Sequence, residues 1–213
     1  MKLSSLIVLT VASMSFELAL AQPATGTPAG DEFAQRASAI VKPMRFSDAD
    51  KTEHVTALTA SYLRQLGQVL AQRQAALDAA GEGATPEIDR QVTDAYRICR
   101  DSTLALRDAY VARLNAVMTP QQVERVKDGI TGDWLHRTAQ VYDEMVPALT
   151  YPQRAHIMGL LVEMRENAMM EVDAGRQEKW VDKYRGIINN YLVAQGHDFT
   201  ALSKAYDAKR QEK

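Results

Sequence analysis

Apolar residues recur every three or four positions over most of the chain, which is the spacing that places side chains on one face of an α-helix. One such series begins near Ser47 and comprises Val55, Leu58, Tyr62, Leu66, Val69 and Leu77. A second series extends to about Met118 and comprises Ile88, Val92, Tyr96, Cys99, Thr103, Leu106, Tyr110, Leu114 and Val117. The two-residue alternation typical of β-strands is absent, so the sequence predicts an all-α fold.

The two long helices are separated by clear stop and start signals. Gly81-Glu82-Gly83 interrupts the first apolar series, and Thr85-Pro86 opens the second. Threonine is a favoured N-cap residue, and proline is tolerated at the first helical position because no intrahelical hydrogen bond needs its missing N–H there. Since the intervening loop is short, we expect the two helices to pack as a long N-terminal antiparallel hairpin.

The C-terminal half contains further helix signals. Thr119 with Gln122, and Thr150 with Gln153, are each spaced as a capping box, in which both side chains satisfy free backbone N–H groups at a helix start. Two later apolar series mark two more helices: Ile157, Leu160, Leu161, Met164 and Ala168, and then Trp180, Tyr184, Ile187, Ile188 and Tyr191. Residues 129–149 lack a regular pattern, and we expect a connection that contains a short helix. The sequence therefore predicts a single-domain helical bundle of about five to six helices.

The first residues have the layout of a secretory signal peptide. Lys2 precedes an apolar stretch over residues 3–16, and Ala19-Leu20-Ala21 supplies small residues for a cleavage site. We expect cleavage after Ala21 and a periplasmic or secreted mature protein. The predicted segments are a signal peptide (1–21), a flexible tether (22–30), a helical domain (31–198) and a partly ordered C-terminal tail (199–213). No later segment approaches the ~20 apolar residues that span a bilayer, so the mature protein is not expected to be membrane-integral.

Charge and cysteine content narrow the function classes. The chain carries 25 Lys and Arg against 27 Asp and Glu, a formal net charge of -2, so a nucleic acid is not an expected partner. Cys99 is the only cysteine, which excludes an internal disulfide. It lies within the apolar series of the second long helix, and we predict that it is buried as a small apolar residue.

Catalytic and metal-binding motifs are not evident. His54, His136, His156 and His197 do not pair at a ligand spacing, so neither a metal nor another cofactor is expected. The Gly-x-Ser-x-Gly motif of serine hydrolases does not occur, and no catalytic residue is assigned. Asp133 and His136 lie one helical turn apart, which suits a ligand or catalytic pair but also an ordinary solvated face. The sequence therefore favours a binding protein over an enzyme.

Two stretches combine aromatic and polar side chains as a glycan site requires. Sugar rings stack on flat aromatic faces, and their hydroxyl groups bind amides, carboxylates or guanidinium groups. The candidate ligand-binding residues are Asp133, Trp134, His136 and Tyr142 in the irregular segment, and Arg185, Asn189 and Asn190 on the last long helix. Trp134 is flanked by glycine and irregular sequence, so we expect it, rather than the helical Trp180, to form an exposed platform.

Several segments carry a family resemblance. They are residues 117–129, 142–147, 149–150, 163–169 and 179–196, with Lys183-Tyr184-Arg185-Gly186-Ile187-Ile188-Asn189-Asn190-Tyr191-Leu192 the most specific. Together they resemble a secreted bacterial family known as domain of unknown function 3826, over about residues 46–198. The resemblance implies a helical envelope protein encoded near genes for plant-polysaccharide use, often pectin, and described as sugar-binding. It implies no catalytic residues, and the segment 134–137 departs from the less polar stretch expected there.

A second, partial resemblance involves the two helix starts. Met118-Thr119-x-x-Gln122 and Leu149-Thr150-x-x-Gln153 are similar to repeats in periplasmic stress chaperones of the Spy and CpxP type. That similarity implies an exported holdase-like chaperone or protein-interaction module with an envelope protein as partner. The leading hypothesis remains an exported accessory protein that binds a plant-derived, for example pectic, oligosaccharide. An unrecognised polysaccharide hydrolase or lyase is third, because two carboxylates suffice for such chemistry.

Overall fold

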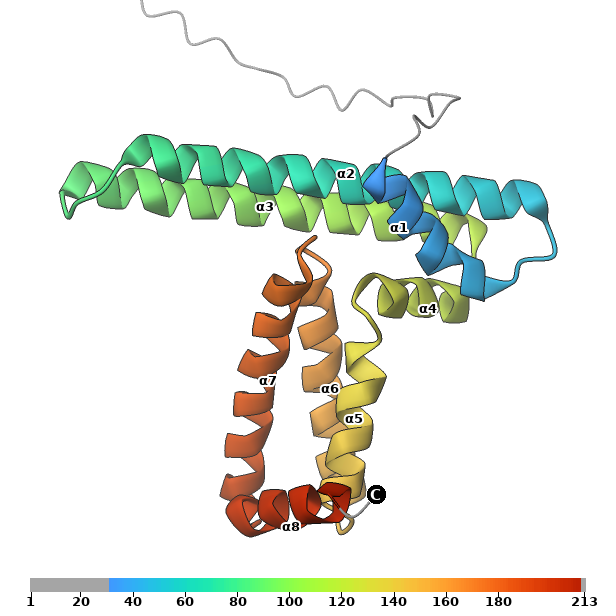
Figure 1. The fold of residues 1–213 in the computed structure, drawn as a ribbon, viewed down its shortest axis with the longest axis vertical. Coiled ribbons are helices and arrows are strands. Elements are labelled where there is room, and N and C mark those ends of the chain that lie inside the picture. Colours follow the sequence, from blue (N-terminus) through green and yellow to red (C-terminus); the bar gives the residue numbers. More distant parts are fainter. Residues whose placement is uncertain (1–30, 212–213) are drawn as a thin grey trace, which may run out of the picture.

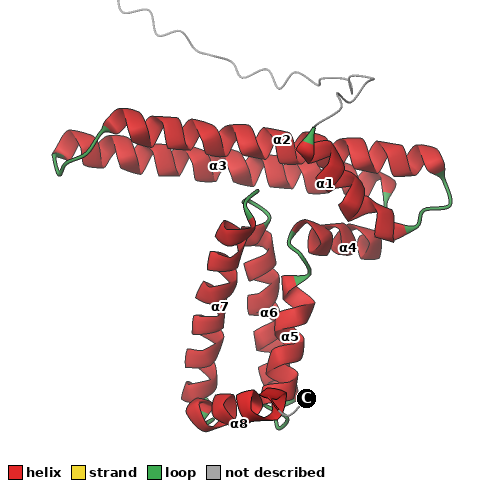
Figure 2. Ribbon diagram, in the orientation of Figure 1, coloured by secondary structure: helices red, strands yellow, loops and turns green. Residues whose placement is uncertain are grey.

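The computed structural model describes residues 31–211, and every regular element in that range is helical (Figures 1 and 2). The helices are α1 (Glu32–Val41), the 3₁₀ turn η1 (Lys42–Met44), α2 (Ala49–Ala80), α3 (Pro86–Val117), α4 (Pro120–Ile130), α5 (Trp134–Met145), α6 (Tyr151–Ala168), α7 (Ala174–Ala194) and α8 (Phe199–Gln211). The all-α prediction is confirmed. The signal peptide and the tether predicted at residues 1–30 lie outside the described range.

The long N-terminal hairpin is also confirmed. Helices α2 and α3 each span 32 residues and run side by side in opposite directions (Figure 1). The side chain of Thr85 accepts a hydrogen bond from the backbone N–H of Ile88, and Pro86 occupies the first turn. Gly81 has a positive φ of 76°, which a residue with a side chain rarely adopts, so it ends α2 without strain. Local sequence signals thus define both ends of the connecting loop.

The molecule has the outline of a T. The hairpin lies across one end of the group formed by α5, α6 and α7, and α8 crosses the opposite end (Figure 1). We refer to α1–α4 as the hairpin lobe and to α5–α8 as the bundle lobe. Both predicted capping boxes are present, at the first turns of α4 and α6, so each lobe contains one of them.

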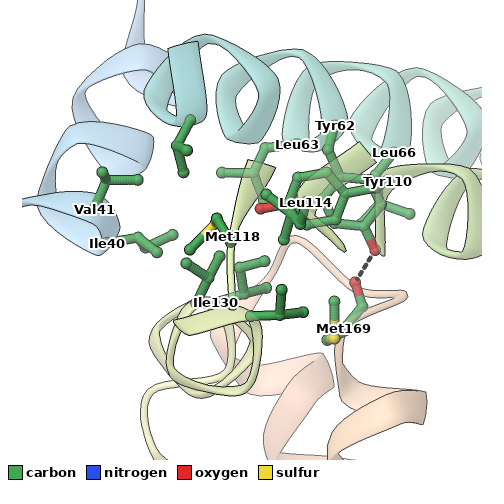
Figure 3. Close-up of a cluster of buried hydrophobic side chains, with 13 residues drawn as sticks. Ile40, Val41, Tyr62, Leu63, Leu66, Tyr110, Leu114, Met118, Ile130 and Met169 are labelled. Carbon is green, nitrogen blue, oxygen red and sulfur yellow. Dashed lines mark hydrogen bonds between the residues drawn. The ribbon is translucent and has the colours of Figure 1, made fainter. Parts of the chain in front are cut away.

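Each lobe has its own cluster of buried apolar side chains. The hairpin-lobe core comprises Ile40, Val41, Val55, Tyr62, Leu63, Leu66, Tyr110, Leu114, Met118, Val123, Val126, Ile130 and Met169 (Figure 3). The bundle-lobe core comprises Leu135, Tyr142, Met145, Val146, Leu149, Ile157, Leu161, Met164, Val181, Tyr184, Ile188 and Leu192. Met169 follows α6 but packs into the hairpin-lobe core, so the loop after α6 joins the two lobes.

The loop after α6 contacts a stacked pair of tyrosines in the hairpin lobe. The rings of Tyr62 and Tyr110 lie 4.3 Å apart and nearly parallel, and the Tyr62 hydroxyl donates a hydrogen bond of 2.7 Å to the Met169 carbonyl (Figure 3). The Tyr110 hydroxyl is 2.9 Å from the hydroxyl of Thr59. Burial raises the pKa of both phenols well above the usual range, so the two tyrosines remain neutral hydrogen-bonding groups.

Two segments are more regular than the sequence suggested. The irregular stretch 129–149 contains the twelve-residue helix α5, and the predicted tail forms α8, whose Phe199, Leu202 and Tyr206 pack against the bundle-lobe core. The described residues therefore contain eight α-helices rather than five or six.

Cys99 is buried as predicted, and burial raises the pKa of its thiol. Within residues 31–211, no helix combines the length and the apolar character needed to cross a membrane.

Candidate functional site

A solvent-open hollow lies where α1, η1, α4 and the start of α5 meet, and we call it the α1–α4 hollow. Its volume is about 640 Å³. The lining residues are Arg36, Ala39, Ile40, Pro43, Met44, Arg125, Asp128, Gly129, Asp133 and His136. Two of the predicted ligand-binding residues, Asp133 and His136, are among them. The hollow thus combines apolar side chains of α1 and η1 with polar side chains of α1, α4 and the start of α5.

The shape of this hollow depends on the close approach of α1 to α4. Gly129 faces Ile40 so closely that an added Cβ would lie 2.9 Å from Ile40 Cγ2. The chain then reverses at the end of α4, where the N–H of Asp133 donates a 2.8 Å hydrogen bond to the Asp128 carbonyl. Asp133 adopts a left-handed conformation with φ of 59°, which aspartate tolerates better than most residues. This reversal brings the first turn of α5 back beside Asp128.

Three side chains with potential ligand atoms converge at the reversal. Nδ1 of His136 lies 2.7 Å from Oδ1 of Asp133 and 3.6 Å from Oδ2 of Asp128. The Asp133–His136 pair was suggested by its spacing, and the structure shows the two side chains in contact. Asp128 was not among the predicted ligand-binding residues, and its five-residue separation from Asp133 matches no helical face. Only the reversal after α4 brings it to the pair.

Behind the hollow, a buried ion network holds Asp128, and we call it the Arg165 network. The Arg165 side chain is 2% exposed. Its Nη1 donates a hydrogen bond of 2.7 Å to Asp128 Oδ1, and its Nη2 donates another to Glu124 Oε2. Lys127 joins the network through Glu124 at 3.0 Å and Glu166 at 2.6 Å. Burial alone would lower the pKa of Arg165, but hydrogen bonds to Asp128 and Glu124 outweigh it and raise the pKa. Arg165 therefore stays charged and fixes the Asp128 carboxylate.

Two arginines border the hollow. Arg36 donates to the carbonyls of Val172 and Ile130, the latter at 3.2 Å, and thereby ties α1 to the segment after α6. Burial lowers the pKa of Arg36, and the nearby Asp173 opposes this effect. Arg125 is more exposed and donates one hydrogen bond of 3.2 Å from Nη2 to the Pro43 carbonyl. Both guanidinium groups are held by backbone carbonyls at the edge of the hollow.

Four of the remaining five predicted residues lie on a different face, between α5 and α7: Trp134, Tyr142, Arg185 and Asn189. The Trp134 ring is half-buried against the bundle-lobe core, with the guanidinium carbons of Arg137 and Arg185 at 4.4 and 5.5 Å from its centroid. This differs from the bare platform expected from the sequence. The physical reason is that α5 is a full helix, so its first residue already faces the core. Trp180 is also half-buried against that core.

Tyr142 has a structural role in this second group. It is 3% exposed, and its hydroxyl lies within hydrogen-bonding distance of Asn189 Oδ1 at 2.7 Å and the Arg185 carbonyl at 3.2 Å. Burial raises its pKa to about 12, although Arg185 opposes the shift. The structure thus brings Tyr142, Arg185 and Asn189 together as a contact between α5 and α7. Asn190 is exposed on α7, outside this contact.

A second concavity runs along the hairpin, and we call it the α2–α3 groove. Its volume is about 610 Å³. It is lined by Leu58, Ser61, Tyr62, Gln65, Gln68, Val69, Gln72, Ile98, Ser102, Ala105, Leu106, Ala109, Tyr110 and Arg113. Most of its wall is apolar, and amide and hydroxyl groups lie among the apolar side chains. No residue predicted for a ligand site lies in it.

Comparison with known proteins supports the family resemblance. The sequence model of one family, described as protein of unknown function (DUF3826), matches residues 31–212. That description states neither a ligand nor an activity. A search of curated proteins finds no match. Because the matched region spans all the described helices and most of the chain, the protein belongs to the DUF3826 family.

Proposed function

We propose that this protein binds an oligosaccharide that carries carboxylate groups, such as a fragment of pectin, in the α1–α4 hollow. One observation carries the proposal: Asp133 and His136, selected from sequence for a ligand site, line the same open hollow as Arg36 and Arg125. A volume of about 640 Å³ lies within the range usual for sites that hold small ligands.

The groups around the hollow match the chemistry of an acidic sugar. A guanidinium group binds a carboxylate through charge-assisted hydrogen bonds, and Arg125 is held at the rim by a single bond to a backbone carbonyl. The Asp133 carboxylate is exposed, and a carboxylate can accept hydrogen bonds from the hydroxyl groups of a sugar. Ile40, Pro43 and Met44 supply an apolar wall for the C–H face of a sugar ring. Since Arg165 already pairs with Asp128, that carboxylate repels an anionic ligand less strongly.

Calorimetry with matched oligosaccharides tests this proposal. We expect an oligogalacturonate to bind the mature protein and a neutral oligosaccharide of equal length to bind much more weakly. Arg125→Gln should weaken oligogalacturonate binding about tenfold or more, because a hydrogen bond to a charged group contributes about 1.5–3 kcal/mol. Arg100→Gln, at an exposed position on α3 away from the hollow, is the matched control and should bind as the wild type does. Equal affinities for the wild type and Arg125→Gln would contradict the proposal.

A second candidate function, protein interaction of the holdase type, is favoured by the α2–α3 groove. The α2 side chains that line it recur at intervals of three and four residues, and those of α3 follow a similar series. Such a surface accepts the apolar face of an amphipathic helix. Ile98 is 55% exposed at one end of the groove, and it offers a site for a disruptive change.

An aggregation assay separates the two candidates. If the groove holds unfolded clients, the wild type should suppress the aggregation of a reduced, unfolding model protein, and Ile98→Lys should lose most of this effect. Arg125→Gln should retain it, because Arg125 lies outside the groove. No suppression by the wild type, or equal suppression by Ile98→Lys, would exclude the groove as a client-binding surface.

A further inference from the structure

The loop between α6 and α7 connects the two lobes, and we call residues 169–173 the joint loop. Met169 lies in the hairpin-lobe core, and its carbonyl accepts the hydrogen bond from Tyr62. The next residue, Met170, is also buried, and its sulfur accepts a hydrogen bond of 3.6 Å from the Thr103 hydroxyl on α3. Both methionines therefore hold the joint loop against the hairpin lobe before the chain enters α7.

Backbone carbonyls of the joint loop are bonded to α1 and α7 as well. Gln177 of α7 is 3% exposed, and its Nε2 donates hydrogen bonds of 2.8 Å to the Glu171 carbonyl and 3.3 Å to the Ile130 carbonyl. Arg36 of α1 donates to the same Ile130 carbonyl and to the Val172 carbonyl. The end of α4 is thus linked to the joint loop through both side chains, so a change of charge in this loop affects the contact between the lobes.

One side chain of the joint loop is poorly satisfied. Oε2 of Glu171 is buried, and no group among residues 31–211 donates a hydrogen bond to it. Nε of Arg73 on α2 is likewise buried and has no acceptor in that range. A buried carboxylate oxygen without a donor is unfavourable when the group is charged and much less so when it is neutral. We propose that Glu171 is a proton switch, whose protonation strengthens the contact between the two lobes.

The surroundings of Glu171 favour the neutral carboxyl on balance. Burial is the largest effect, and it raises the pKa of Glu171 above the usual range. Asp173 in the same loop acts in the same direction. Three cations act in the opposite direction: Arg73 of α2, and Arg176 and Lys179 of α7. The buried thiol of Cys99 on α3 is a further titratable neighbour.

Protonation of Glu171 should stabilise the folded protein at mildly acidic pH. A carboxyl with a raised folded-state pKa contributes its full stability below its unfolded-state pKa, about 4.3, and loses it as the pH rises through the folded-state value. The contact between the lobes should therefore be stronger in mild acid than at neutral pH. The proposal does not depend on the binding of an oligosaccharide.

Urea unfolding of Glu171→Gln over a range of pH tests the switch. Glutamine has nearly the shape of a protonated glutamate and carries no charge. At neutral pH, we expect the variant to unfold at a higher urea concentration than the wild type, and the difference should shrink as the pH falls toward about 4.3. Glu178→Gln is the matched control, because Glu178 is exposed on α7. Its difference from the wild type should not change with pH.

Arg73→Gln provides a second variant with its own expected direction. Arg73 favours the charged form of Glu171, so its loss should increase the stability that the protein loses between mild acid and neutral pH. A smaller loss than in the wild type would contradict the switch.

Amide hydrogen exchange shows whether the effect lies in the joint loop. The N–H groups of Met169, Met170 and Glu171 donate to carbonyls of the last turn of α6. At neutral pH, these amides should be better protected in Glu171→Gln than in the wild type. Equal protection would overturn the proposed location. A stability difference between Glu171→Gln and the wild type that is absent, reversed or equal at every pH would overturn the switch itself.

Discussion

Replacing Arg165 with alanine should lower the free energy of unfolding by about 3–5 kcal/mol, the cost of leaving a buried partner charge unpaired. Arg165 lies on α6 in the bundle lobe and is 2% exposed, whereas its partners Asp128 and Glu124 belong to α4. The substitution would leave the buried Asp128 carboxylate without its cation and remove a contact between the lobes. Urea unfolding followed by circular dichroism measures the change.

Arg97→Ala provides the control for this prediction. Arg97 pairs with Asp94 on α3, but both side chains are about half exposed, so the loss should be below about 1 kcal/mol. A comparable loss in the two variants, or a loss below about 1 kcal/mol in Arg165→Ala, would show that the buried network does not stabilise the fold.

The effect of Arg165→Ala should also depend on pH. Burial alone would raise the pKa of Glu124, but hydrogen bonds from Lys127 and Arg165 outweigh it and hold the pKa below its usual range. A carboxyl with a lowered folded-state pKa contributes its full stability above its unfolded-state pKa, about 4.3, and loses it as the pH falls through the folded-state value. The contribution of Glu124 to the stability difference between the wild type and Arg165→Ala should therefore be complete above about pH 4.3 and decrease as the pH falls below that value.

Leu161→Ala should cost about 2–5 kcal/mol and should still unfold in a single transition. Leu161 is fully buried in the bundle-lobe core, where its truncation leaves a cavity. The chain has two tryptophans, Trp134 and Trp180, and both pack against this core. Tryptophan fluorescence therefore reports the bundle lobe, whereas far-ultraviolet circular dichroism reports the helices of both lobes. We expect the two signals to coincide, because Met169 and the Arg165 network couple the lobes.

Met158→Ala supplies a control on the same helix. Met158 is 41% exposed, so its truncation should change the stability by much less than that of Leu161. A fluorescence transition at lower urea than the circular dichroism transition in Leu161→Ala would contradict the expected coupling and show that the bundle lobe unfolds first.

Features encoded within one helix or one turn could be predicted from the sequence. The hairpin followed from two apolar series separated by a glycine break and the Thr85-Pro86 start. The capping boxes at Thr119 and Thr150 formed as expected, because the four residues of each box lie next to one another in the chain. Asp133 and His136, whose three-residue spacing left a functional pair and a solvated face both open, are in contact at exposed positions.

Features that depend on distant contacts could not be predicted in this way. Arg165 and Asp128 are 37 residues apart, and no local pattern pairs them. Trp134 was expected to be exposed because its neighbours are irregular, but α5 packs against α6 and α8, and the ring lies against the bundle-lobe core. The division into two cores depends on the path of the chain after α6, where Met169 enters the hairpin lobe. A single sequence contains no direct record of that path.

The distal half of the hairpin has few buried contacts, and this arrangement has a consequence for amide hydrogen exchange. From residue 67 to residue 94, around the Gly81–Gly83 turn, no side chain belongs to the fully buried class. Backbone hydrogen bonds that lack buried neighbours open by local fraying, whereas those beside a core open only with larger units of structure. Protection in α2 and α3 should therefore increase steadily from that turn toward the stacked Tyr62 and Tyr110. We therefore expect the amides near the Gly81–Gly83 turn to exchange quickly through local opening, and those near Tyr62 and Tyr110 to exchange slowly.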